Sequence, residues 1–351
     1  MKTTHWTVLV VVVFLLAYGC NRGTEPTPQS VVDPAKLKMF APLPETATPS
    51  PGSLESARAS LGRMLYYDVR LSKNQTIACN SCHQLDAYGV DNEPTSEGHK
   101  GQRGNRNSPT VYNAAGHFAQ FWDGRARDVE EQAKGPVLNP AEMAMPGEKH
   151  VVAVLKSMPE YVQSFRQAFP EAKDPVTYQN MANAIGAFER GLLTPARWDK
   201  FLKGDQAALT QVEKAGFGTF LDAGCATCHS GAFLGGNFFQ KLGLAKDYPE
   251  TQDPGRFNLT KNDGDRMMFK VPSLRNIEKT GPYFHNGRVP SLQQAISRMA
   301  EYQLGRQLND QEVTSIVAWM KSLTGEIPAE YIRKPELPKS TPATPRPETT
   351  D

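Results

Sequence analysis

The sequence predicts a mostly α-helical protein with two domains. Its 351 residues are about twice the length of a domain of roughly 150 residues. Helical periodicity recurs along the chain, and no long alternation of apolar and polar residues indicates a large sheet. Residues 175–193 read as one long helix ended by Pro195, and residues 311–323 read as an amphipathic helix. We expect the boundary between the domains near Thr194.

Three more helices are predicted from their start signals. In each, a Ser, Thr or Asp suited to an N-cap is followed three residues later by Glu or Gln, the spacing of a capping box. The pairs are Asp128 with Glu131, Thr210 with Glu213, and Ser291 with Gln294.

Charge and composition exclude other classes of protein. Lys and Arg number 39 against 37 Asp and Glu, so a net charge of +2 gives no broad positive field, and nucleic-acid binding is not expected. A hydrophobic content of 39% is enough for buried cores and argues against wholesale disorder. The 5 cysteines are too few for a disulfide scaffold, so each is interpreted by its position.

The first residues read as an export signal. Residues 8–18 are almost wholly apolar but too few to span a membrane, so residues 1–19 are predicted to be a signal peptide. Cys20 follows a small residue and precedes a polar stretch, which resembles a bacterial lipoprotein cleavage site. Either Cys20 is lipidated and anchors the protein to a membrane, or cleavage nearby leaves it as a free thiol or removes it.

Two segments are assigned outside the folded domains. Residues 20–49 are interpreted as a linker. Residues 334–351 carry five prolines and no apolar periodicity, so we expect an extended tail that lies on the surface or is disordered. Residues 50–193 and 194–333 remain as the two domains.

Four of the cysteines lie in two C-x-x-C-H motifs, at residues 79–83 and 225–229. This spacing bonds two thiols to the vinyl groups of one haem and presents the histidine to its iron. The alternative of redox disulfides would require a βαβ context that the sequence lacks, and zinc is weaker still because each motif has its own histidine. We therefore predict one covalently bound haem c in each domain. The residues that bind the two haems are Cys79, Cys82, His83, Cys225, Cys228 and His229.

Further motifs, in order along the chain, carry a resemblance to a known family. They are Thr95 to His99, Asn107 to Thr110, Gln120 to Arg125, Asn139 to Met143, Val271 to Asn276, Pro282 to Gly287, and Met299 ahead of Gln303 to Gly305. With the two C-x-x-C-H motifs, they make residues 50–345 similar to the bacterial dihaem cytochrome c peroxidases. The resemblance implies two cytochrome c-like domains that meet at an interface bridging the haems.

The resemblance also implies an activity, the reduction of hydrogen peroxide to water. Electrons would arrive one at a time from a small soluble donor, either a cytochrome c or a cupredoxin, and the protein would work in the periplasm. Homodimers are common in the family. No feature of this sequence identifies the donor or demonstrates a dimer.

Around the first haem, the resemblance assigns four residues. His83 is the proximal ligand, and His99 matches a removable ligand in a glycine-rich loop whose backbone freedom would let the imidazole leave the iron. Glu142 matches a distal acid/base that moves a proton between the two peroxide oxygens, and Gln132 matches a polar group that orients the substrate. Without the resemblance, the last three would be read as ordinary loop or surface residues.

At the second haem, His229 is the proximal ligand and Met299 matches a thioether ligand. A Met/His pair raises the iron potential relative to His/His. By sequence distance alone Met267 and Met268 are rivals, and methionines at helical spacing mostly fill cores. Trp122 matches an aromatic residue between the haems that would assist electron transfer; its other reading is a buried interface side chain.

The resemblance adds one calcium ion between the domains. Asn107, Thr280 and Pro282 match the positions that bind it, partly through backbone carbonyl oxygens. Such an ion would lock the domains together and couple the His99 loop to the redox state of the second haem.

Two other functions fit part of the sequence. The dihaem oxidase that matures the tryptophylquinone cofactor of methylamine dehydrogenase has similar motifs, but a tyrosine replaces the methionine ligand. Met299 argues against that function, and the neighbouring Tyr302 keeps it open. A dihaem cytochrome that only transfers electrons would keep both irons closed in every redox state.

Overall fold

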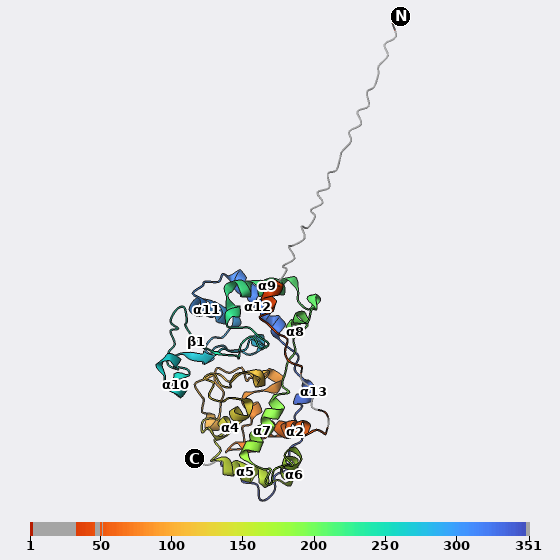
Figure 1. Ribbon diagram of the computed structural model, residues 1–351, viewed down its shortest axis with the longest axis vertical. Helices are drawn as coiled ribbons and strands as arrows, with labels where there is room; N and C mark the ends of the chain where they lie inside the picture. The colour runs from red at the N-terminus through yellow and green to blue at the C-terminus, as the bar shows by residue number, and fades with distance from the viewer. Residues whose placement is uncertain (3–32, 46–49, 51, 349–351) are drawn as a thin grey trace.

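The computed structural model describes residues 1–2, 33–45, 50 and 52–348 (Figure 1). The apolar stretch of the predicted signal peptide and Cys20 lie outside the described residues. None of the described helices has the length and hydropathy that crossing a bilayer requires. The described chain forms two helical domains with very little sheet, which confirms the predicted fold class.

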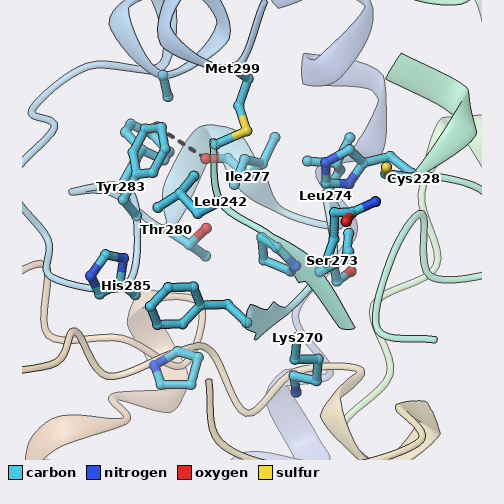
Figure 2. Close-up of a pocket in the computed structure, with 18 of the residues that line it drawn as sticks. Cys228, Leu242, Lys270, Ser273, Leu274, Ile277, Thr280, Tyr283, His285 and Met299 are labelled. Carbon is cyan, nitrogen blue, oxygen red and sulfur yellow. Dashed lines mark hydrogen bonds between the residues drawn. The ribbon is translucent and has the colours of Figure 1, made fainter. Parts of the chain in front are cut away.

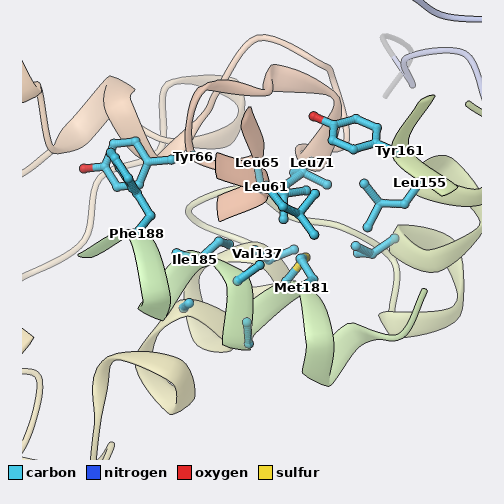
Figure 3. Close-up of a cluster of buried hydrophobic side chains, with 14 of the residues drawn as sticks. Leu61, Leu65, Tyr66, Leu71, Val137, Leu155, Tyr161, Met181, Ile185 and Phe188 are labelled. Carbon is cyan, nitrogen blue, oxygen red and sulfur yellow. The ribbon is translucent and has the colours of Figure 1, made fainter. Parts of the chain in front are cut away.

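The first domain occupies the lower half of Figure 1 and is built around two helices in close contact. Its helices are α2 (Leu54–Tyr67), α3 (Cys79–Cys82), α4 (Val129–Leu138), α5 (Glu148–Lys156), α6 (Pro159–Ala168) and α7 (Tyr178–Glu189). Helix α2 approaches α7 closely because Gly62 has no side chain: a Cβ there would lie 1.9 Å from the carbonyl oxygen of Ala184. Leu61, Leu65 and Ile185 form part of the buried core around this contact (Figure 3). Burying each such side chain stabilises the fold by about 1.5–3 kcal/mol.

The second domain repeats this arrangement with an aromatic core. Its elements are α8 (Arg197–Leu202), α9 (Gln211–Ala223), β1 (Phe239–Lys241), α10 (Phe257–Thr260), β2 (Met268–Lys270), α11 (Leu292–Leu304) and α12 (Asp310–Met320). Gly216 lets α9 approach α12, since a Cβ there would lie 1.9 Å from the carbonyl oxygen of Ser315. Beside this contact, the ring of Trp319 lies 4.4 Å from that of Phe220 and 5.5 Å from that of Trp198, centroid to centroid. Strands β1 and β2 form one antiparallel pair.

Short elements connect these helices. The remaining α-helices are α1 (Pro34–Leu37) and α13 (Ala329–Ile332). The 3-10 turns are η1 (Val69–Leu71), η2 (Leu85–Ala87), η3 (His99–Gly101), η4 (Ala114–Gly116), η5 (Gln206–Ala208), η6 (Cys225–Thr227), η7 (Asp263–Asp265), η8 (Ile277–Lys279) and η9 (Lys321–Leu323).

The predicted helices are present, and the capping signals account for their starts. The side chains of Asp128, Thr210 and Ser291 each accept a hydrogen bond from the backbone N–H three residues on, at the starts of α4, α9 and α11. The long helix predicted for residues 175–193 is shorter, because Thr177 caps α7 and the helix ends at Glu189. The helix predicted for residues 311–323 ends in the 3-10 turn η9.

The described parts of the predicted linker and of the predicted tail each pack on the domain far from them in sequence. Within the predicted linker, the ring of Phe40 lies 5.3 Å from that of Phe217 in the second domain. The predicted tail, where described, runs extended along the first domain. There the guanidinium of Arg70 donates a 2.8 Å hydrogen bond to the carbonyl oxygen of Pro338, and the backbone N–H of Glu348 donates one of 3.0 Å to the carbonyl oxygen of Lys73. Both segments therefore hold the domains together.

Buried polar groups fix the interface between the domains. Thr194 is fully buried, and its hydroxyl accepts hydrogen bonds of 2.9 Å from Asn113 of the first domain and 2.9 Å from Asn276 of the second. Arg106 pairs with Asp123 of its own domain at 2.7 Å and with Asp253 of the second domain at 2.7 Å. Paired and hydrogen-bonded in this way, these groups give the interface a defined geometry.

Candidate active site

The first C-x-x-C-H motif forms the short helix α3 and the residue after it. The N-cap N–H of Ala78 donates a 3.0 Å hydrogen bond to the hydroxyl of Ser81, which fixes the helix start. Burial raises the pKa of Cys79 to about 12 and that of Cys82 to about 11. A redox C-x-x-C pair requires a lowered thiol pKa, so these values favour a structural or cofactor-binding role over thiol–disulfide exchange.

The ring of His83 is held neutral. Burial lowers its pKa, and the charge of Asp91 and the backbone groups of Gly89 and Pro109 oppose that shift. Its Nδ1 atom has no hydrogen-bond partner among the described residues. A neutral imidazole is the form that ligates a metal. The residue therefore fits the role of a proximal iron ligand.

The second motif begins where α9 ends, at Gly224. This glycine has φ 94°, a left-handed conformation that turns the chain into η6 and then into Cys228 and His229. Nδ1 of His229 lies 3.0 Å from the carbonyl oxygen of Leu234, which leaves Nε2 free for a metal. Burial also lowers the pKa of His229, so its ring is neutral.

A large, mostly apolar cavity lies beside this motif and reaches the domain interface. Cys225, Cys228 and His229 line it together with Met299 from α11. Figure 2 shows Met299 and Cys228 on its wall. Two thiols, a neutral imidazole and a thioether thus open onto one apolar space, a donor set that fits a covalently bound haem.

The sequence offered three methionines as ligands of the second haem, and one of them lines the cavity. Met299 lines it, whereas Met267 and Met268 do not. Tyr302, which kept the oxidase alternative open, is not among the lining residues either. Met320 of α12 also lines the cavity and was not considered from the sequence, because it belongs to the apolar pattern of an amphipathic helix.

Glu142 and His99 lie in adjoining loops of the first domain. The backbone N–H of His99 donates a 2.7 Å hydrogen bond to the carbonyl oxygen of Glu142. Burial raises the pKa of Glu142, while a 2.7 Å hydrogen bond from Asn139 and the charge of Arg125 lower it. The ring of His99 is buried, and its Nδ1 has no hydrogen-bond partner among the described residues. An unpartnered buried imidazole nitrogen fits a metal ligand.

Gln132 and Trp122, also assigned from the sequence, lie in different parts of the molecule. Gln132 is half-buried on α4, and its side chain forms no hydrogen bond with the described residues. Trp122 lies at the domain interface, where its Nε1 donates a 2.9 Å hydrogen bond to the carbonyl of Asn107. Its own carbonyl accepts a 2.8 Å hydrogen bond from the N–H of Lys270.

The residues assigned to calcium from the sequence all line this cavity. Asn107, Thr280 and Pro282 line it beside Trp122. Nδ2 of Asn107 donates a 3.0 Å hydrogen bond to the carbonyl of Glu93, which leaves its Oδ1 atom as an available oxygen donor. No group of three or more His, Cys, Asp or Glu suited to a metal ion occurs among the described residues. Any calcium site here would therefore depend on amide and carbonyl oxygens.

Sequence reasoning gave no role to three residues that the fold brings to the cavity: His117, Lys270 and His285, the last of which lies in the Pro282 to Gly287 motif. The ring of His285 stacks on Phe269 at 4.3 Å, and burial lowers its pKa. Lys270 had a signal that was not used, since it is a charged residue between the apolar residues Phe269 and Val271.

Comparison with known proteins identifies the family. The family model described as di-haem cytochrome c peroxidase matches residues 56–207, and that for cytochrome c matches residues 213–324. A cytochrome c551 peroxidase of Pseudomonas aeruginosa is 46% identical over 317 residues, covering 88% of this chain and 90% of that protein. The chain belongs to the dihaem cytochrome c peroxidase family. It accordingly has two c-type haem domains, as the sequence predicts.

Other relatives are similar to this dihaem peroxidase over most of its length. The cytochrome c551 peroxidase of Nitrosomonas europaea is 48% identical, covering 82% of this chain and 85% of that protein. The methylamine utilization protein MauG of Methylorubrum extorquens is more distant, at 31% identity over 87% of this chain and 89% of that protein. Among solved structures, a MauG-like protein associated with microbial copper homeostasis aligns with a TM-score of 0.73 at 28% identity, covering 84% of this chain and 97% of that one.

Proposed function

We propose that this protein is a dihaem cytochrome c peroxidase, which reduces hydrogen peroxide to two molecules of water with two electrons and two protons. The observation that carries the proposal is the half-buried carboxyl of Glu142, joined through the backbone to the loop of His99 in the domain of the first haem. Family membership supports the reaction type. A purely electron-transferring cytochrome has no use for an acid/base group with a raised pKa in a loop that adjoins a histidine of this kind.

The haem iron supplies the redox chemistry that cleaves the O–O bond, and the chain's own residues bind it and move the protons. Cys79, Cys82 and His83 would hold the first haem. Glu142 would take a proton from the inner oxygen of peroxide at its carboxylate and deliver it to the outer oxygen, which leaves as water. Burial favours this exchange because it raises the carboxyl pKa toward neutrality, while Asn139 fixes the orientation of Oε1.

Cys225, Cys228, His229 and Met299 would hold the second haem. Gln132 would orient peroxide by hydrogen bonding, and Trp122 would connect the two haem sites. The position of Trp122 at the interface, bonded to Asn107 on one side and Lys270 on the other, supports this role.

Activation would act through the loop that carries His99. In the oxidised protein, His99 would block the first haem, and reduction at the second would release it. The backbone around His99 supports the movement, since Gly101 has φ 74°, a left-handed conformation that glycine adopts readily, and its neighbour Lys100 has φ 57°. A calcium ion held by Asn107, Thr280 and Pro282 would transmit the change across the interface.

The cellular setting is part of the proposal. Residues 1–19 would direct export to the periplasm. Cys20 would be either lipidated, or left as a free thiol or removed by cleavage nearby. The donor would be a small cytochrome c or a cupredoxin that docks near the second haem, and two copies of the chain would form a homodimer. Residues 50–193 and 194–333 would be the two domains, with the boundary at the buried Thr194.

A steady-state assay tests the function. Hydrogen peroxide and reduced cytochrome c are supplied to the holoprotein, first fully oxidised and then half-reduced. We expect peroxide-dependent oxidation of the donor, faster after half-reduction. Absence of turnover in both states, with two fully six-coordinate low-spin haems, would overturn the peroxidase assignment. Equal rates in both states would overturn only the gating by His99.

A further inference from the structure

The cavity beside Cys225 and Cys228 contains a single side chain with a full formal charge. Among the described residues that line it, this residue is Lys270 on β2. Lys270 is only 7% exposed. No described carboxylate forms an ion pair with it, and burial lowers its pKa to about 8. At neutral pH it is therefore a buried ammonium group without a counter-ion, an arrangement that proteins rarely keep.

The hydrogen bonds of Lys270 leave part of its capacity unused. Nζ donates to the carbonyl oxygen of Ala119 at 2.9 Å and lies 3.3 Å from Nδ1 of His117. An ammonium group has three donors, and a carbonyl and an imidazole are both uncharged partners. Neither compensates for the lost hydration of the charge.

His117 also has an unsatisfied polar atom. It lines the same cavity, and its Nε2 atom is buried with no hydrogen-bond partner among the described residues. The ring is held in place by an edge-to-face contact with Phe233, with centroids 5.5 Å apart. One cationic donor from the second domain and one imidazole from the first thus meet on the wall of an otherwise uncharged cavity.

The unsatisfied groups of Lys270 and His117 require an anionic partner. The group that fills the cavity can supply that anion. We propose that Lys270, with His117 beside it, binds a propionate carboxylate of the second haem. A haem carries two propionates, and a carboxylate is the partner that a buried ammonium requires. The proposal rests on a haem bound at Cys225 and Cys228, and it does not depend on peroxidase turnover.

Such a contact has a redox consequence. Reduction adds an electron to the haem, and a fixed positive charge nearby favours the reduced form. Because Lys270 also hydrogen-bonds residue 119 of the first domain, the same side chain would tie the second haem to the domain interface.

The test compares holoproteins that carry Lys270→Met, Lys270→Arg and a control, Lys214→Met. Lys214 is matched, since it lies in the same domain, is 8% exposed and does not line the cavity. Two readouts apply. The first is the redox infrared difference spectrum, with haem propionates labelled with ¹³C. The second is the midpoint potential of the second haem.

We expect Lys270→Met to shift the labelled carboxylate bands and to lower the equilibrium constant for reduction about tenfold, which is about 59 mV for one electron. Lys270→Arg, which keeps the charge but moves the donors, should shift the bands with a smaller change in potential. Lys214→Met should change neither. Unchanged labelled bands in the Lys270 variants would overturn the proposal and leave Lys270 as an interdomain tie. If Lys270→Met does not accumulate with haem, the bands of Lys270→Arg decide. If the wild-type protein lacks peroxidase activity while the Lys270 variants give the expected shifts, only the proposed function is refuted.

Discussion

The backbone N–H of His99 donates a 2.7 Å hydrogen bond to the carbonyl oxygen of Glu142. The bond joins the loop of the proposed removable ligand to the segment that carries the proposed acid/base. The contact is tight, because a Cβ on Gly98 would lie 2.0 Å from the carbonyl oxygen of Ala141. The two loops therefore pack as one unit, and we expect displacement of His99 to alter the position of Glu142.

Substitution of Gly98 by Ala tests that packing. The added methyl must push the two loops apart, at a cost of about 1–3 kcal/mol for overpacking. We expect the oxidised protein to lose low-spin ligation at the first haem, visible by electron paramagnetic resonance, and to need less prior reduction for activity. Gly104→Ala is the control, since a Cβ there would meet nothing within 4 Å. Indistinguishable spectra for the two variants would show that the loop contact does not set His99 ligation.

Replacement of Glu142 by Gln removes the proton carrier but keeps the shape of the side chain. We expect kcat/KM for peroxide to fall by roughly 10²–10⁴-fold, the usual contribution of a general acid/base. Both haems should still load, as measured by haem content. Glu148→Gln, at an exposed position in the first turn of α5, should retain activity. Wild-type turnover by Glu142→Gln would remove this residue from the mechanism.

The pH dependence of turnover reports on Asn139. Its hydrogen bond lowers the pKa of Glu142, against the larger effect of burial, which raises it. The carboxylate is the form that accepts a proton, so activity is lost as pH falls through this pKa. Removing the bond with Asn139→Ala raises the pKa further and should move the acidic limb of the kcat/KM profile to higher pH. An acidic limb that stays in place, or moves to lower pH, would contradict this role.

The identity of the sixth ligand of the second haem is tested by Met299→His. Exchange of thioether for imidazole should lower the midpoint potential by on the order of 0.1 V or more, within the range of about 0.8 V that axial ligands span. Met267→Leu serves as the control, because Met267 is buried nearby but does not line the cavity. If Met299→His left the potential unaltered while Met320→Leu changed it, the ligand would be Met320.

The buried pair of Arg275 and Asp199 is expected to stabilise the second domain. The guanidinium is 1% exposed and bonds the carboxylate at 2.7 and 2.9 Å. Arg275→Met would leave Asp199 charged and unpaired, at a cost of about 3–5 kcal/mol in the free energy of unfolding. The exposed pair of Arg266 and Asp263 is the comparison, and Arg266→Met should cost no more than about 1 kcal/mol. Denaturant unfolding of both variants measures the difference.

The sequence by itself determined the class of cofactor and the helical framework. Two C-x-x-C-H motifs are complete within five consecutive residues each, and the caps of α4, α9 and α11 are complete within four. Signals of this kind depend on neighbours along the chain, so they can be read without knowing the fold.

Tertiary structure alone decided which distant side chains meet. Met299 lines the cavity of His229 while Met267 does not, and no local pattern distinguishes the two. Lys270 and His117 come from different domains, and they face the same cavity only because the domains pack against each other. Such contacts depend on how the helices pack and the domains dock, which cannot be predicted from the distance between two residues along the sequence.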